Sequence, residues 1–219
     1  MISYIRRRGP AAFTLIELLL VILVLTILYG ISLTSIRAVS RHTHQTATAA
    51  ELKSIETAWK QYYAHYQRWP TNAPDTTAEH PDGLVEELAE AMQGTGDDDA
   101  DLMNPDKIVF MEFARLNDKG APLNVWGESG RFADAPCLYY VAFDDDYDNW
   151  VEFPTDDLPV SETESDPKST SEYLKKWRAL RAFEKNGENY RIRRGVIVWT
   201  FNPEIKADSP DYLIGSWQE

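Results

Sequence analysis

The chain has 219 residues, a formal net charge of -13 and a pI near 4.7. Proteins that bind nucleic acids need clustered basic residues, so this acidic balance argues against a nucleic-acid partner. The length allows one membrane-spanning helix and one globular domain of ordinary size. Cys137 is the only cysteine, which excludes an intramolecular disulfide.

The N-terminal residues 1–12, MISYIRRRGPAA, contain three arginines and no acid. They precede an apolar run, residues 13–33, in which Glu17 is the only charged residue. At 1.5 Å per residue, a helix of this length covers roughly 30 Å, which is the thickness of the hydrocarbon core of a bilayer. Because the basic residues come before the run, we expect a single membrane span with its N-terminus in the cytoplasm and the rest of the chain outside.

The apolar run lacks the small-residue cleavage site that follows the apolar region of a secretory signal peptide. The segment FTLIE, residues 13–17, lies behind a short basic leader and begins the apolar run. This arrangement resembles the processing signal of type IV pilins and of the pseudopilins of type II secretion. The resemblance implies that prepilin peptidase cuts between Ala12 and Phe13 and methylates the new amino terminus. Ala12 departs from the Gly that is usual at this position in the family.

Glu17 is the residue of this run that most needs a partner, because a carboxylate carried to the middle of a membrane costs about 2–3 kcal/mol on insertion scales. The resemblance implies that Glu17 meets the ammonium group of Phe13 in a neighbouring subunit and so sets the axial register of a filament. The alternative is that Glu17 reaches the membrane interface and complements the N-terminus of its own helix.

The helix is predicted to continue beyond the membrane, from Phe13 to about Gln67, because the chain has no proline between Pro10 and Pro70. One apolar stripe with helical spacing runs along its outer part and is expected to pack on a sheet. The stripe consists of Leu52, Ile55, Trp59, Tyr62 and Tyr66. His42 and His44 are two positions apart, so they point to different faces of the helix and do not suit a shared metal ion.

After Pro70 the sequence predicts a short helix at residues 84–93 and two strands, at residues 107–113 and 137–143. Between the strands lies PLNVWG, residues 122–127, which resembles the Pro-Trp-Gly turn of the major pseudopilin of type II secretion. Trp126 is equally consistent with an aromatic side chain that caps a turn of the core.

The loop FDDDYDNWV, residues 143–151, is the only segment with a clear set of metal ligands. Asp144, Asp146 and Asp148 alternate, and Asn149 can adopt the left-handed conformation that folds a loop around an ion. Such hard oxygen ligands suit calcium, although the bidentate Glu of an EF-hand loop is absent. Major pseudopilins bind calcium in this region, which supports calcium; a solvated acidic turn is the alternative.

The C-terminal third begins with an acidic, proline-containing segment, residues 154–171, which is expected to form an exposed excursion. A helix is predicted to follow, with Ser169 and Glu172 as a capping box, Trp177 and Leu180 on its buried face and Gly187 at its end. The last segment, residues 195–217, is predicted to form an apolar strand, a turn and a short terminal strand, and it resembles the closing segment of many pseudopilins.

These observations predict an α+β protein with a type IV pilin-like fold, in which a long N-terminal helix packs on a small antiparallel sheet. Its expected segments are the cleaved leader 1–12, the transmembrane part of the helix 13–33, the outer part of the helix 34–69, and a soluble head 70–219 with an acidic insertion at 154–187.

The expected function is that of a structural subunit of a type IV pilus or a type II secretion pseudopilus, not that of an enzyme. Its expected partners are prepilin peptidase, further copies of itself, the assembly machinery and the inner membrane. The filament would be periplasmic or on the cell surface, and calcium is the only expected cofactor. The alternative is a membrane-anchored extracytoplasmic binding module or enzyme that does not polymerise. The sequence has no Gly-rich phosphate loop, Ser/His/Asp order or Cys/His metal spacing that would indicate catalytic residues.

Overall fold

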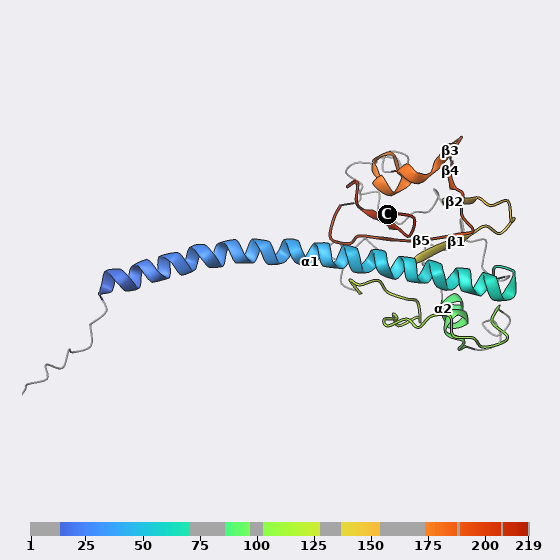
Figure 1. Cartoon of the computed structure of the whole chain (residues 1–219), viewed down its shortest axis with the longest axis horizontal. Coiled ribbons are helices and arrows are strands. Elements are labelled where there is room, and N and C mark those ends of the chain that lie inside the picture. Colours follow the sequence, from blue (N-terminus) through green and yellow to red (C-terminus); the bar gives the residue numbers. More distant parts are fainter. Residues whose placement is uncertain are drawn as a thin grey trace, which may run out of the picture. The chain divides into compact units, whose positions relative to one another are not determined.

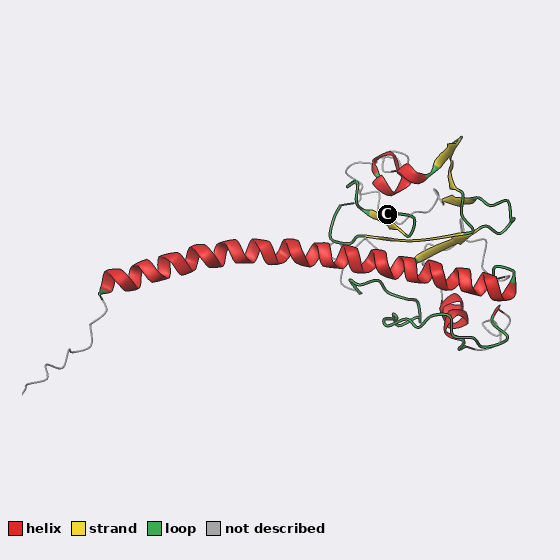
Figure 2. Ribbon diagram, in the orientation of Figure 1, coloured by secondary structure: helices red, strands yellow, loops and turns green. Residues whose placement is uncertain are grey.

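The computed structural model describes residues 14–70, 86–96, 103–127, 137–153, 174–187, 189–206 and 208–218, without the side chains of 31–38, 40 and 41. The chain divides into two compact units, Met1–Thr43 and His44–Glu219, and we call the second unit the head. The secondary-structure elements mix helices with antiparallel strands, so the predicted α+β class is confirmed (Figures 1 and 2). In chain order they are α1 (Leu15–Tyr66), α2 (Glu86–Gln93), β1 (Tyr140–Phe143), β2 (Val151–Phe153), the 3-10 helix η1 (Arg178–Ala182), β3 (Glu184–Asn186), β4 (Asn189–Ile192), β5 (Val196–Phe201) and β6 (Leu213–Gly215).

Helix α1 agrees closely with the helix that the sequence predicts. It ends where Gln67 adopts a left-handed conformation, with φ 54°, and Gln67 N donates a hydrogen bond to Tyr63 O at 2.8 Å. Four of the five residues of the predicted stripe, Leu52, Ile55, Trp59 and Tyr62, are fully covered, and Tyr66 is half-buried. They share one core cluster with residues of α2, β1 and β5, so the expectation that the stripe packs on a sheet is confirmed.

The central sheet has the strand order β1-β5-β6, with every neighbouring pair antiparallel. Successive side chains of a strand point to opposite faces. Val141 and Phe143 accordingly join the core cluster of α1, whereas Tyr140 and Ala142 join a second cluster on the other face. Many antiparallel sheets leave one face to solvent, but here both faces are covered by apolar side chains.

The second face is covered by η1 and by a second antiparallel sheet with the order β2-β4-β3. Figure 1 shows these elements on the side of β1 and β5 that is opposite to α2. This second cluster is rich in aromatic rings; Phe153 lies 5.2 Å from Trp199 and Trp177 lies 6.0 Å from Phe201, measured between ring centroids. The head therefore has three layers, with the central sheet in the middle.

The helix predicted near residues 169–187 is wrong for its described part. One helical turn at residues 174–176 ends before Trp177, which has the extended φ and ψ values of -67° and 121°, and η1 and β3 follow. Arg178 N donates to Pro210 O at 2.8 Å, a bond outside any helix, while Trp177 and Leu180 are buried in the second cluster. Gly187, with φ 68°, lies in the turn between β3 and β4. The residues of the predicted capping box and of the excursion 154–171 lie outside the described part of the chain.

The strand predicted at residues 107–113 is also wrong, because this segment lies alongside the helices without pairing as a strand. Phe110 N and Met111 N both donate to Met92 O near the end of α2, at 2.9 and 3.1 Å. Phe110 and Phe113 pack against the core cluster of α1. The apolar side chains that suggested a strand thus cover the helices. The other predicted elements, at residues 84–93, 137–143 and 195–217, correspond to α2, β1, β5 and β6.

The turn at residues 122–127 is fixed by Asn124, whose side chain is fully buried. Its Nδ2 donates to Thr200 Oγ1 of β5 at 2.9 Å, and its Oδ1 accepts from Trp126 N at 3.1 Å. Asn124 N also donates to Cys137 O at 2.8 Å. Trp126 packs on the core beside this turn, as the sequence predicts.

Candidate functional site

Glu17 lies in the first turn of α1 and forms a reciprocal cap with Thr14. The N and Oγ1 atoms of Thr14 donate to Glu17 Oε2 at 3.0 and 2.8 Å, and Glu17 N donates back to Thr14 Oγ1 at 3.3 Å. This is the capping box of a helix N-terminus, and the pattern Thr-x-x-Glu in FTLIE was the signal from which it could have been predicted. Glu17 therefore complements its own helix in the single chain. Ala12 and Phe13 lie outside the described residues.

The side chains described between residues 14 and 30 are all exposed in the first unit. They include large apolar groups such as Leu15, Leu18 and Tyr29, which are 82%, 59% and 67% exposed. The Thr26 hydroxyl donates to Ile22 O and Leu23 O at 2.7 and 2.8 Å, so this polar group has its partners within the helix. Over the residues whose side chains are described, no helical stretch has both the length and the apolarity that crossing a membrane requires.

Asp144, Asp146 and Asp148, the predicted calcium ligands, come together in the loop between β1 and β2. One carboxylate oxygen from each lies within 4.8 Å of the others. The loop is shaped by its own hydrogen bonds: Asn149 N donates to Asp144 Oδ2 at 3.0 Å and Asp148 N donates to Asp146 Oδ1 at 3.2 Å. Asn149 has φ 69°, the left-handed conformation that the sequence predicts for it.

Asp144 differs from the other two carboxylates in its surroundings. It is 6% exposed, and its Oδ1 has no hydrogen-bond partner among the residues that the structure describes, whereas Asp146 and Asp148 are exposed. Burial raises the pKa of Asp144 above its usual range, and the nearby charges of Asp148 and Asp146 add to this rise. A divalent cation would satisfy the free oxygen and offset the repulsion. Exposed carboxylates also gather in loops that hold no ion.

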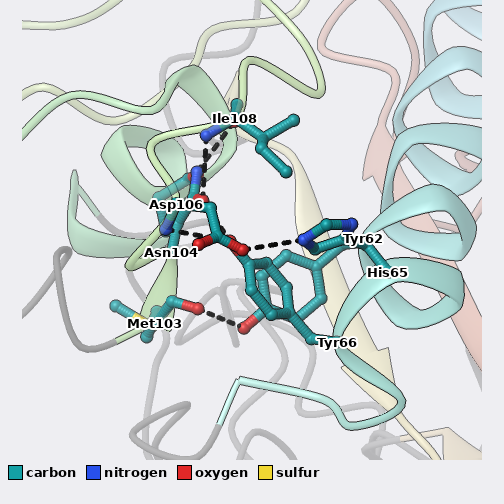
Figure 3. Close-up of polar contacts among 8 residues, drawn as sticks. Tyr62, His65, Tyr66, Met103, Asn104, Asp106 and Ile108 are labelled. Carbon is teal, nitrogen blue, oxygen red and sulfur yellow. Dashed lines mark hydrogen bonds and ion pairs between the residues drawn. The ribbon is translucent and has the colours of Figure 1, made fainter.

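The C-terminal end of α1 is bonded to residues 103–108, as Figure 3 shows. Tyr62 OH donates to Met103 O at 2.7 Å, Tyr66 OH donates to Asn104 Oδ1 at 2.6 Å, and His65 Nε2 lies 2.8 Å from Asp106 Oδ2. Burial raises the pKa of Tyr62 to about 12. The tyrosines at the end of the helix therefore anchor a loop, and their partners could not be predicted from the sequence.

Two carboxylates of α1 also form ion pairs with distant parts of the head. Glu56, which is 4% exposed, accepts from Arg194 Nη1 at 2.8 Å and from Lys60 Nζ at 2.6 Å. Glu51 accepts from Arg115 Nη2 at 2.7 Å and from the hydroxyl of Tyr139. Burial raises the pKa of Tyr139, so its hydroxyl keeps the proton that it donates. These contacts fix α1 to the loops and strands around it, which is a structural role.

His44 remains half-buried beside Trp126, with their ring centroids 6.0 Å apart and edge to face. His42 is exposed, and neither histidine belongs to a group of potential metal ligands within the described residues.

Searches of protein-family models, of characterised proteins and of solved structures find no match to this chain. The function must therefore be argued from the residues themselves.

Proposed function

We propose that the chain is a structural subunit of a type IV pilus or of a type II secretion pseudopilus, with a type IV pilin-like fold. Prepilin peptidase would cut between Ala12 and Phe13, and the mature chain would wait in the inner membrane with its N-terminus in the cytoplasm before it assembles. The observation that carries the proposal is α1, which starts at Leu15 directly behind the FT of the processing motif and ends within the core of the head.

The first part of α1 supports this proposal by its surface. A helix that is apolar on all sides is covered either by protein or by lipid. In this chain, residues 13–33 are numerous enough for a helix as long as the hydrocarbon core of a bilayer is thick. The side chains described in this run are all exposed. Lipid would cover them in the monomer, and the same part of neighbouring helices would cover them in a filament.

Glu17 supports the proposal through its free hydrogen-bonding capacity. An ionised carboxylate has about four lone-pair sites, and the two bonds from Thr14 both use Oε2. The other oxygen, Oε1, can accept from the methylated ammonium group of a neighbouring Phe13 without loss of the cap. The intramolecular cap and the contact between subunits are thus compatible.

The main test is mass spectrometry of the mature protein taken from the cells that make it. We expect the chain to begin at Phe13 with a methylated amino group, and we expect it in filaments sheared from the cells or induced by overproduction. Replacing Ala12 with Gly should leave processing intact, whereas Ala12→Trp should block it. Filaments whose subunits begin at Met1 would refute the proposal. A chain cut at Phe13 that stays monomeric under all conditions would favour the alternative, an anchored binding module or enzyme.

We also propose that the loop between β1 and β2 binds calcium through Asp144, Asp146 and Asp148, with Asn149 closing the loop. The specific observation that favours this is the buried Oδ1 of Asp144, which has no hydrogen-bond partner in the described part of the chain. The ion would take the place of a disulfide as a clamp between β1 and β2.

The calcium test uses the full chain in detergent and compares thermal unfolding of the head with calcium and with a chelator. At roughly 100 times Kd, calcium should raise the Tm by about 5–10 °C. Asp146→Ala should abolish this shift. Asp145→Ala is the matched control, because it removes the same charge from the same loop and should keep the shift. If calcium leaves the wild-type Tm unchanged, the loop is a solvated turn.

A further inference from the structure

The head carries a cluster of basic residues although the whole chain is acidic. We call it the basic turn, and it lies in and around η1 and β3. Its members are Lys175, Lys176, Arg178, Arg181 and Lys185, and Glu184 is the one acid between them. Such a local excess of positive charge attracts an acidic partner.

The cationic side chains of the basic turn are exposed because the apolar residues between them pack into the core. Leu174, Trp177 and Leu180 point into the second core cluster, so the cations between them face solvent. Within the described part of the chain, Lys175, Lys176 and Arg181 have no ion-pair partner. Arg178 Nη1 pairs with Asp211 at 3.1 Å, and Lys185 Nζ lies 6.0 Å from the centroid of the Tyr190 ring.

The loop between β1 and β2 presents the opposite charge. Asp144, Asp146 and Asp148 gather with one another, whereas the carboxylate of Asp145 lies outside that group. We call Asp145 and Tyr147 the outer side of the loop. Asp145 is exposed and has no ion-pair partner among the described residues. Tyr147 is 50% exposed, its hydroxyl accepts from Trp69 N at 3.4 Å, and its ring centroid lies 6.4 Å from that of Tyr63.

The two surfaces do not pair within one copy. Figure 1 shows η1 and the loop between β1 and β2 at separate places on the head, and no ion pair joins them in the described residues. A contact between these two surfaces would therefore have to join two copies of the chain. Because the two surfaces differ, this contact is heterologous, and each copy keeps one free surface of each kind. Such a contact extends into a chain of copies.

We propose that the basic turn of one copy binds the outer side of the acidic loop of a second copy. Lys175, Lys176 and Arg181 would attract Asp145, which is the exposed charge of this side of the loop. This inference rests on the proposed function as a filament subunit. Exposed ion pairs are individually weak and salt-sensitive, so this contact sets the register of the heads while the apolar parts of the helices supply most of the affinity.

The test is disulfide cross-linking of the full-length chain in the membranes of the cells that make it. Lys176→Cys with Asp145→Cys should give a ladder of dimers, trimers and longer products under mild oxidation, because each copy carries both halves of the contact. Cys137 is buried and should not react. The matched control is Lys119→Cys with Asp145→Cys, which places the thiol at an exposed lysine outside the basic turn and should give no ladder. Absence of a ladder from the first pair, or an equal ladder from the control, would overturn the inference.

A charge exchange gives a second measurement, made with a photo-reactive amino acid at Tyr147 so that no cysteine is needed. Lys176→Glu with Arg181→Glu should lower the yield of cross-linked copies about tenfold. Adding Asp145→Lys to this variant should restore the yield, and failure of the restoration would count against the contact. Mass spectrometry of the N-terminus on the same samples keeps the two proposals separate. Chains that begin at Phe13 and form filaments without a ladder would refute the contact and leave the proposed function intact.

Discussion

The two parts of α1 belong to one helix but have opposite surroundings. From residue 14 to residue 30 every described side chain is exposed, and most are apolar. In the head, Leu52, Ile55, Trp59 and Tyr62 of the same helix are fully buried, and charged residues such as Lys53 and Lys60 occupy its outer face. The first part therefore has its apolar surface on all sides, and the second has it on one stripe.

This difference shows that the two parts are stabilised in different ways. The second part gains from tertiary packing, which supplies most of the stability of helices in globular proteins. The described side chains of the first part have no such packing. Under the proposed function, lipid or other copies cover them. Substitutions on α1 should accordingly separate effects on assembly from effects on the head.

The largest effect is expected from Glu17→Ala, which changes the first part of α1 alone. The variant should enter the membrane and be processed at Phe13, because a carboxylate is removed from an apolar run. Filament yield should fall to near zero, because the proposed contact of Glu17 with the ammonium group of a neighbouring Phe13 would be lost. Electron microscopy of sheared material and immunoblots of the processed chain measure the two outcomes. Wild-type filaments from this variant would leave Glu17 with the intramolecular cap alone.

Trp59→Ala should act on the head and leave the first part of α1 untouched. The ring is fully buried and lies 5.0 Å from Phe143 and 5.5 Å from Tyr62 between centroids. Its removal should destabilise the head by about 3–5 kcal/mol, which is typical of large aromatic truncations in a core. Urea unfolding of the full chain in detergent, with proteolysis as the probe of the unfolded fraction, measures this loss.

The matched control for Trp59→Ala is Gln61→Ala, on the exposed face of the same helix. It should change the free energy of unfolding by less than about 0.5 kcal/mol. Equal effects of the two substitutions would show that the stripe does not hold the head together.

Elements with a strong local pattern could be predicted from the sequence. Helix α1 has a long run without proline and a stripe with helical spacing, and β5 is a short apolar strand, so local preference and tertiary packing agree there. Local preference and tertiary packing disagree at residues 107–113, where residues with a high strand preference pack against α2 and form no strand. They also disagree at Trp177, where insertion of the ring into the second cluster interrupts the predicted helix.

The candidate site follows the same division. The three aspartates of the loop between β1 and β2 are close in sequence, so their convergence was predictable. The pairing of Glu56 with Arg194, which lies 138 residues later in the chain, was not, because nothing local links the two. The second sheet, β2-β4-β3, was not predicted either. Its strands are only three or four residues long, which is too short for a clear sequence pattern.

Tyr62→Phe should give a smaller effect, which depends on pH. Loss of the bond from Tyr62 OH to Met103 O should destabilise the head by about 1 kcal/mol at neutral pH. In the wild type the pKa of Tyr62 is about 12 in the folded state, against 10 for the ordinary value. Between these two pH values the unfolded chain releases the proton while the folded chain keeps it, so stability falls as pH rises from 10 towards 12.

Tyr62→Phe should remove part of this alkaline loss, as measured by urea midpoints of the full chain in detergent at pH 8 and pH 11. The exposed Tyr147 provides the control: it is the smallest of the causes that act on the pKa of Tyr62, so Tyr147→Phe should keep most of the alkaline loss of the wild type. If the two variants lose stability equally between these pH values, the hydroxyl of Tyr62 is not buried in the way described.

The smallest effect is expected from Thr14→Val, which removes the hydroxyl of the helix cap and keeps Glu17. Caps of this kind contribute about 1 kcal/mol, and the loss is confined to the first turn. Hydrogen exchange in detergent should be somewhat faster for the amide of Glu17, which loses its bond to Thr14 Oγ1 and keeps only the bond to Thr14 O at 3.1 Å. Filament yield should stay close to that of the wild type. Thr14→Ser keeps a hydroxyl and should match the wild type in both measurements. If Thr14→Val instead abolished filaments as completely as Glu17→Ala, the carboxylate would act through its own helix cap, because the cap is the only interaction that the two substitutions both remove.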